Sequence, residues 1–154
     1  MEVTRQQLEE YRSDKQEILE LTYRIENRWK DEAMIGNDVV LDYSKGYPMP
    51  QFVVGFDQER YEHLQDRDVR RKDKLEKKCK ETEDWVEEIE DGITRRIFRM
   101  FFLEGRKQKD VAKAVHIDQS RVSRKIEEYL KTHSTHKKHV YNNNRASRRK
   151  QAAR

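Results

Sequence analysis

The stretch QKDVAKAVHIDQSRVSRKIEEYL, residues 108–130, has the spacing of two short helices joined by a tight turn. Its apolar residues recur at helical intervals, which places them where the two helices would face each other. These residues are Val111, Val115, Ile117, Val122 and Ile126. Ala112 stands where two such helices approach most closely, and only a small side chain fits there. The pattern predicts a helix-turn-helix.

The turn and the start of the second helix support this interpretation. Such turns usually hold a glycine with positive φ, and here His116 takes that place, a residue type that tolerates the left-handed region. Asp118 is placed to cap the second helix by accepting backbone N–H bonds. Polar and basic side chains follow, of the kinds that reach base edges and phosphates from the major groove. The alternative is an ordinary helical hairpin with a solvated, charged face.

Charge is distributed unevenly along the 154 residues. Residues 1–92 hold 16 lysines and arginines against 25 acidic residues, a net charge of −9. Residues 93–131 hold 11 against 5, and residues 132–154 hold 7 against none. An acidic N-terminal part and a basic C-terminal part are expected of a chain whose C-terminal part binds a polyanion. The expected helix-turn-helix lies inside the basic part, so two independent observations indicate nucleic-acid binding there.

Residues 1–92 predict a helical dimerisation or partner-docking module. Residues 3–31 and residues 58–90 each show apolar positions at helical spacing, so we expect two long helices that fold back as an antiparallel hairpin. Trp29 and Trp85 are expected in the core between them. The expected inner positions are Leu8, Tyr11, Ile18, Ile25 and Trp29 on the first helix, and Leu75, Cys79, Thr82, Val86 and Ile89 on the second.

An irregular insert, residues 33–57, separates the two long helices because its glycines and prolines break any helix. DVVLDY (residues 38–43) and QFVVGF (residues 51–56) are rich in β-branched and aromatic residues. They could pair as a small β-hairpin or lie extended over the helices. Since a lone hairpin is marginal in water, we expect these apolar side chains to bury against the helices or against a partner.

Residues 93–131 are expected to form the DNA-binding domain, with a bend or domain edge at Asp91-Gly92. Its first helix, residues 93–104, should end at Gly105 as a left-handed C-cap. The expected core residues of this helix are Ile93, Ile97, Phe98, Phe101, Phe102 and Leu103.

The tail, residues 132–154, is polar, basic and free of acids, and we expect it to be disordered. Its densest basic cluster is expected to lie along phosphates, the alternative being a solubilising terminus. That cluster includes Arg148, Arg149 and Lys150.

Composition and motifs argue against other classes of protein. A chain that is 42% charged and 34% hydrophobic does not suit an enzyme with a deep buried site, and it carries no catalytic motif. The single cysteine, Cys79, excludes an internal disulfide and fits a reducing cytosol. No apolar run approaches the roughly 18 residues of a membrane span, and the N-terminus lacks a signal-peptide core. We therefore expect a cytoplasmic, non-enzymatic protein without a cofactor.

A metal site is not expected either. His133, His136 and His139 are spaced three apart, but they would spread over more than one helical face. Neither a carboxylate nor a cysteine lies near them in sequence, and a zinc site needs about four converging ligands.

The stretch IEDGITRRIFRMFFLEGRKQKDVAKAVHIDQSRVSRKIEEYL, residues 89–130, resembles the C-terminal region four of bacterial sigma factors, which reads the −35 promoter element. The layout of the whole chain resembles the phage-encoded late transcriptional regulators of the RinA and ArpU type. In that group a helical N-terminal part precedes a short irregular segment, here NDVVLDYSKGYPMPQFVVGF (residues 37–56). A second helix and a sigma-like helix-turn-helix follow.

The resemblance implies an activator of late phage genes that binds double-stranded DNA in the host cytoplasm and could also contact host RNA polymerase. A homodimer would double its footprint on DNA. The alternative is a DNA-binding packaging or assembly adaptor, such as a small terminase subunit. The candidate DNA contacts are Gln119, Ser120, Arg121, Ser123, Arg124 and Lys125 on the recognition helix, Arg106 and Lys107 near the DNA backbone, and Arg148, Arg149 and Lys150 in the tail.

Overall fold

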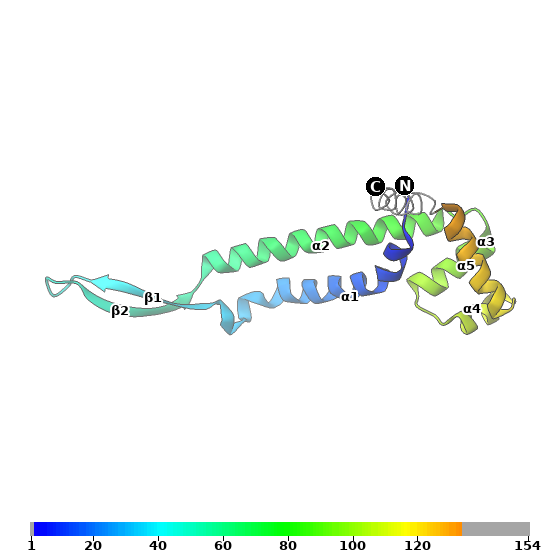
Figure 1. Cartoon of the computed structure of the whole chain (residues 1–154). Coiled ribbons are helices and arrows are strands. Elements are labelled where there is room, and N and C mark those ends of the chain that lie inside the picture. Colours follow the sequence, from blue (N-terminus) through cyan, green and yellow to red (C-terminus); the bar gives the residue numbers. More distant parts are fainter. Residues whose placement is uncertain (1, 134–154) are drawn as a thin grey trace, which may run out of the picture. The chain divides into compact units, whose positions relative to one another are not determined.

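In a computed structural model, which describes residues 2–133, the chain is mostly α-helical with one two-stranded antiparallel sheet, as expected (Figure 1). The described residues divide into two compact units, one holding residues 2–14 and 77–133, the other residues 15–76. In chain order the elements are α1 (Arg5–Asn27), two 3-10 turns (Arg28–Lys30 and Glu32–Met34), β1 (Ile35–Asp42), β2 (Met49–Phe56), α2 (Gln58–Glu87), α3 (Gly92–Phe98), a π-helical turn (Arg99–Leu103), α4 (Gln108–Val115) and α5 (Gln119–His133).

The core of the first unit joins the N-terminal segment and the end of α2 to the three short helices α3, α4 and α5. Its most deeply buried side chains are Leu8, Val86, Ile89, Ile97, Phe98, Val111 and Val122. The rings of Trp85, Phe98 and Tyr129 contact one another edge to face, with centroids 5.2 to 5.9 Å apart. Because residues on both sides of the break at 91–92 line this core, the break is a bend inside one unit. The boundary expected at residue 92 is not the edge of a compact unit.

The bend is built by a helix cap. The carboxylate of Asp91 accepts hydrogen bonds from the main-chain N–H of Thr94 at 3.1 Å and from its hydroxyl at 2.5 Å. The Thr94 hydroxyl and N–H together hold the pKa of Asp91 below its usual value. At the far end of the segment Gly105 has φ +70°, so the expected left-handed C-cap is confirmed.

The expected core of residues 93–104 is confirmed in most positions and wrong in one. Ile97, Phe98 and Phe102 are buried, and Phe101 and Leu103 are partly buried against the same cluster. Ile93 is 41% exposed, although its neighbour Thr94 in the first turn of α3 is buried, so Ile93 lies on the outward side of this turn.

In the second unit the two long helices run antiparallel, as expected. Arg71 of α2 lies 2.9 Å from the carboxylate of Glu17 near one end of this part of α1. Towards the other end, the side-chain amide of Gln65 donates to the main-chain carbonyl of Ile25 at 2.8 Å. Residue numbers rise along α1 while those of the contacting residues on α2 fall, so the two helices run in opposite directions.

A buried ion pair joins the 3-10 turn after α1 to α2. The guanidinium of Arg28 contacts the carboxylate of Asp68, and both side chains are 4% exposed. Arg28 also donates to the side-chain oxygen of Gln65 at 2.5 Å, and Arg67 donates to Asp68 at 3.0 Å. Burial alone would raise the pKa of Asp68, but the hydrogen bonds and charges of Arg67 and Arg28 outweigh it and hold this pKa below its usual value.

The core expected along the two long helices is only partly correct. All five inner positions expected on α2 and its C-terminal continuation are buried, as are Leu8 and Tyr11 of α1. The expectation for Trp29 is wrong, because α1 ends at Asn27 and the following 3-10 turn carries the indole outward to 60% exposure. Trp85 lies in the core as expected, while Leu21 is buried on α1 and Ile18 and Ile25 are half-buried.

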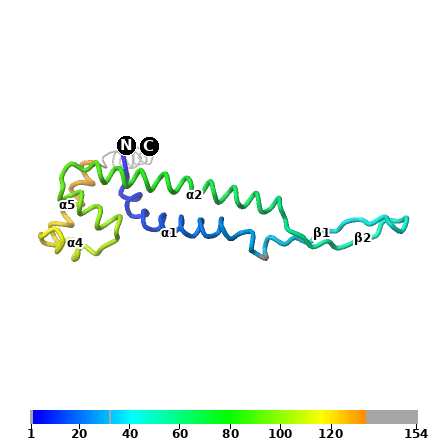
Figure 2. Tube along the Cα trace, turned by 180° about the vertical axis from the view of Figure 1, so that it is seen from behind, coloured from blue at the N-terminus to red at the C-terminus, as the bar shows by residue number. Residues whose placement is uncertain are grey.

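The insert forms a β-hairpin, one of the two expected arrangements. Ile35 stands opposite Phe56 and Asp42 opposite Met49 in the antiparallel register. Its apolar side chains do not bury against the helices, which was one of the two expected ways of covering them, since Phe52, for example, is 82% exposed. In both views the hairpin extends away from the helices of its own unit (Figures 1 and 2).

Two isoleucines one turn apart on α3 test the core. Ile97→Ala should lower the free energy of unfolding by about 2–5 kcal/mol, because it leaves a cavity beside Phe98. Ile93→Ala, the matched control, should cost less than about 1 kcal/mol, because this side chain is already half in water. Urea unfolding followed by circular dichroism measures both. Equal losses would contradict the core described above.

The low pKa of Asp68 predicts a dependence of stability on pH. A carboxyl whose pKa is lower in the folded than in the unfolded chain stabilises the fold above its unfolded pKa, about 4, and this contribution is lost as the pH falls through the folded pKa. Stability should therefore fall more steeply below about pH 4 in the natural chain than in Asp68→Asn. Asp73→Asn on the exposed face of α2 should keep the natural slope. Urea titrations between about pH 7 and pH 3 give the free energy of unfolding of the three proteins. If this free energy depends on pH in the same way in all three, the result contradicts a stabilising ion pair between Arg28 and Asp68.

Candidate nucleic-acid interface

Helices α4 and α5 are joined by residues 116–118 and pack on the core of the first unit. His116 has φ 57° and ψ 42°, so the expected left-handed residue in the turn is confirmed. Its main-chain N–H donates to the carbonyl of Ala112, which closes α4. The side chains that α4 and α5 bury are Val111, Ala112, Val115, Val122, Ile126 and Leu130. Because this face of α5 is buried, the opposite face is fixed towards solvent.

Asp118 takes the cap position of α5, but its side chain does not act as expected. Its main-chain carbonyl accepts from the N–H groups of Arg121 at 3.0 Å and Val122 at 3.1 Å. Within residues 2–133 its carboxylate receives no hydrogen bond. The side-chain cap predicted from the sequence is therefore wrong, and the carboxylate remains exposed at the start of the helix.

The outward face of α5 carries the polar residues expected there. Gln119, Ser120, Arg121 and Arg124 are exposed, and Ser123 is half-buried. Neither arginine forms an ion pair with any acidic residue in the described part of the chain. Two guanidinium groups are therefore available to a ligand outside the protein.

Three further candidates differ in availability. Arg106 is paired with Glu104 at 2.7 Å, so its charge is partly compensated. Lys125 lies 3.8 Å from the capping residue Asp91 and is only 38% exposed. Lys107 is exposed directly before α4. The tail candidates Arg148, Arg149 and Lys150 lie outside the described residues.

The structure adds two lysines that the sequence analysis missed. Lys109 and Lys113 are exposed on α4 and line a surface depression together with His116, Gln119 and Arg121. Their spacing of four places them on one helical face, and this periodicity could have identified them. Asp118 also lines the depression, so its charge is mixed although predominantly positive.

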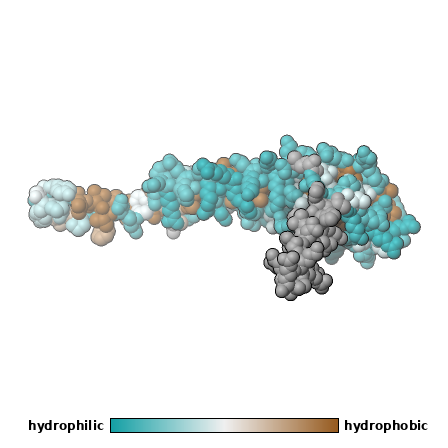
Figure 3. Space-filling view, turned by 45° about the horizontal axis from the view of Figure 1, so that its top comes forward, coloured by the Kyte–Doolittle hydropathy of each residue, from teal (hydrophilic) through white to brown (hydrophobic). Residues whose placement is uncertain are grey.

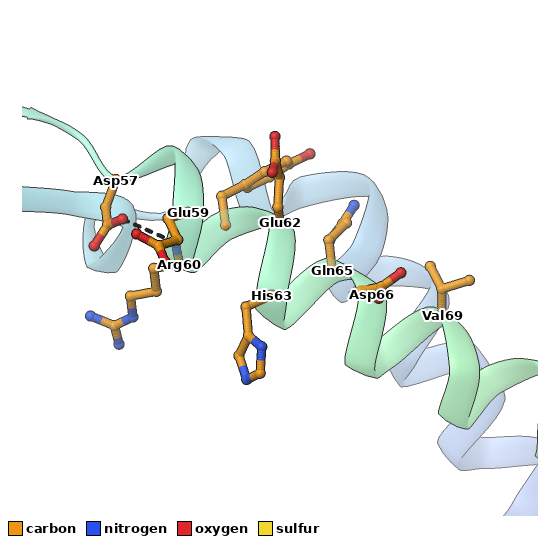
Figure 4. Close-up of a pocket in the computed structure, with 9 residues that line it drawn as sticks. Asp57, Glu59, Arg60, Glu62, His63, Gln65, Asp66 and Val69 are labelled. Atoms are coloured by element: carbon orange, nitrogen blue, oxygen red, sulfur yellow. Dashed lines mark hydrogen bonds between the residues drawn. The ribbon is translucent and has the colours of Figure 1, made fainter.

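A second depression lies at the start of α2, and its chemistry differs. Four acidic residues line it beside Arg60 and His63, namely Asp57, Glu59, Glu62 and Asp66. Figure 4 shows Arg60 and His63 pointing away from Glu62, so the titratable side chains do not converge on one point. The predominantly acidic lining does not suit a polyanion. Within residues 2–133, no group of histidine, cysteine and acidic side chains is arranged to hold a metal ion.

Comparisons with protein-family models, with curated proteins and with solved structures found no match to this chain. Among the helices of residues 2–133, none combines the length and the apolar character needed to cross a membrane. The interpretation of the α4–α5 surface therefore rests on its own geometry and charge.

The left-handed turn predicts opposite effects of two substitutions at one position. His116→Val should lower the free energy of unfolding by about 1–2 kcal/mol, because a β-branched side chain is strained at this φ. His116→Gly should leave stability unchanged or raise it, because glycine adopts positive φ without strain. Urea unfolding of both variants measures the difference. A valine variant as stable as the glycine variant would contradict the turn geometry.

Proposed function

We propose that this protein is a sequence-specific DNA-binding regulator of transcription, with α5 as the helix that enters the major groove. One observation carries the proposal: α5 is held by a buried inner face and presents Arg121 and Arg124 outward, and neither arginine forms an ion pair with any of residues 2–133. A rigid helix with outward arginines suits base recognition, because arginine pairs bidentately with guanine or with phosphate oxygens.

The neighbouring side chains have complementary roles in this proposal. Gln119 suits adenine, which a side-chain amide recognises in a bidentate manner, and Ser120 suits a base edge or a phosphate. Lys107, Lys109 and Lys113 would contact phosphates, which orient the protein without reading sequence. These lysines supply the salt-dependent part of the affinity.

The resemblance of residues 89–130 to sigma region four supports a site near a promoter. We extend the proposal to activation of late phage genes in the host cytoplasm, with RNA polymerase as a second macromolecular partner. The lysines and arginines of residues 132–154 would add affinity that does not depend on base sequence.

Selection from a random DNA pool tests the proposal and supplies the target. The full chain should enrich a defined sequence, and Arg124→Ala should weaken binding to it by about 1–3 kcal/mol at constant salt, because one bidentate contact is lost. Arg70→Ala is the control, since this exposed arginine lies on α2 and pairs with Asp66. Fluorescence anisotropy at matched ionic strength measures the affinities.

Several outcomes would contradict the proposal. Failure to enrich any DNA sequence would contradict sequence-specific binding. Equal losses of DNA affinity in Arg124→Ala and Arg70→Ala would show that α5 is not the recognition helix. Sequence-tolerant binding by a ring-shaped oligomer would instead support a packaging adaptor.

A further inference from the structure

The β-hairpin has two chemically different faces. In an antiparallel pair, residues directly opposite each other share a face, and the face alternates along each strand. One face therefore carries Ile35, Asn37, Val39, Leu41, Pro50, Phe52, Val54 and Phe56. The other carries Gly36, Asp38, Val40, Asp42, Met49, Gln51, Val53 and Gly55. We call the first set the apolar face and the second the mixed face.

The apolar face is uncharged and open to solvent. None of its eight positions is charged in a chain that is 42% charged, and Asn37 is its one polar member. Figure 3 shows hydrophobic residues gathered over this hairpin, at the left of the view. Its six large apolar side chains are between 47% and 82% exposed, namely Ile35, Val39, Leu41, Phe52, Val54 and Phe56.

The exposed area is large enough for a specific contact. With on the order of 100–200 Å² for each such side chain when fully exposed, the apolar face offers on the order of 600 Å². That equals roughly the upper limit of about 300–600 Å² for the largest apolar patch on a typical monomer. Two copies of the face would together bury on the order of 1,200 Å², which reaches the lower end of specific interfaces.

We propose that the apolar face is a self-association surface, on which the hairpin of a second copy of this chain packs face to face. A two-fold arrangement places eight uncharged positions against the same eight, so that no charge is buried. Homodimer interfaces are the most apolar class of protein contact, as this face requires. The two sheets would form a small sandwich, which supplies the layer that a lone hairpin lacks.

Two observations favour a second copy over other ways of covering the hairpin. Pro50 removes a main-chain donor from β2, which disfavours the addition of a strand along the β2 edge of the sheet. The apolar face carries no charge that could select a different, charged protein as its partner. A second copy of the same uncharged face packs on it without any charge complementarity. The inference does not rest on the proposed DNA binding, because both hairpin strands belong to residues 15–76 and the test contains no DNA.

Two adjacent valines provide a matched test on the full chain. Val54 lies on the apolar face and Val53 on the mixed face, at 66% and 47% exposure. The natural chain should sediment as a dimer at micromolar concentration. Val54→Lys should raise the dimer dissociation constant by about 100-fold, because it brings an unpaired ammonium group into the contact from each copy. Val53→Lys, which stands opposite Asp38, should change it less than about threefold.

Cross-linking supplies a second readout. The single natural cysteine, Cys79, is 2% exposed, so an added surface thiol would be the reactive one. Val54→Cys should form a disulfide between two copies under mild oxidation, and Val53→Cys should not. Far-ultraviolet circular dichroism confirms that each variant retains the helices of the natural chain.

The result that supports the inference is a dimer weakened selectively by Val54→Lys and cross-linked selectively through Val54→Cys. A natural chain that remains monomeric at all concentrations would overturn it, including the case in which an unlike protein covers the face. Equal sensitivity at positions 53 and 54, or insensitivity at both, would overturn it as well.

Discussion

The anchoring of α5 by one face is the constraint on which the α4–α5 surface depends. Val122 and Ile126 are buried in the same cluster as Phe98 and Val111, so α5 cannot rotate without exposing a core side chain. This fixes Arg121 and Arg124 towards solvent. The left-handed His116 contributes by reversing the chain within three residues, which brings the apolar sides of α4 and α5 onto a common core.

Helices with strong periodicity could be predicted from the sequence. The stripe from Leu75 to Ile89 is buried, and so are the positions expected between Val111 and Ile126 except Ile117, which is partly buried in the turn. Apolar side chains at a helical repeat form one continuous stripe that folding removes from water. The positive φ of His116 and of Gly105 could also be predicted, because each residue stands directly after a predicted helix, where the chain turns in the left-handed conformation. Pattern and turn chemistry therefore account for most elements of the fold.

The errors arose where the end of an element or its packing determines the outcome. Trp29 fits the helical repeat, but α1 stops at Asn27 and the repeat no longer applies. Asp118 has the right residue type for a cap, yet side-chain rotation decides whether its carboxylate reaches the N–H groups. The spacing of Lys109 and Lys113 predicts a shared helical face, but the depression that they line with Gln119 and Arg121 forms only when α4 and α5 pack together. The exposure of the hairpin could not be foreseen, because alternation fixes which residues share a face and not what covers that face.

The first compact unit is discontinuous in sequence, since it combines residues 2–14 with residues 77–133. Leu8 and Val86 line the same cluster as the short helices, so a fragment beginning at residue 93 would lack part of its own interior. The segment that carries α5 is therefore not an excisable module. During synthesis the N-terminal residues emerge first, but they can complete this unit only after the last short helix has left the ribosome.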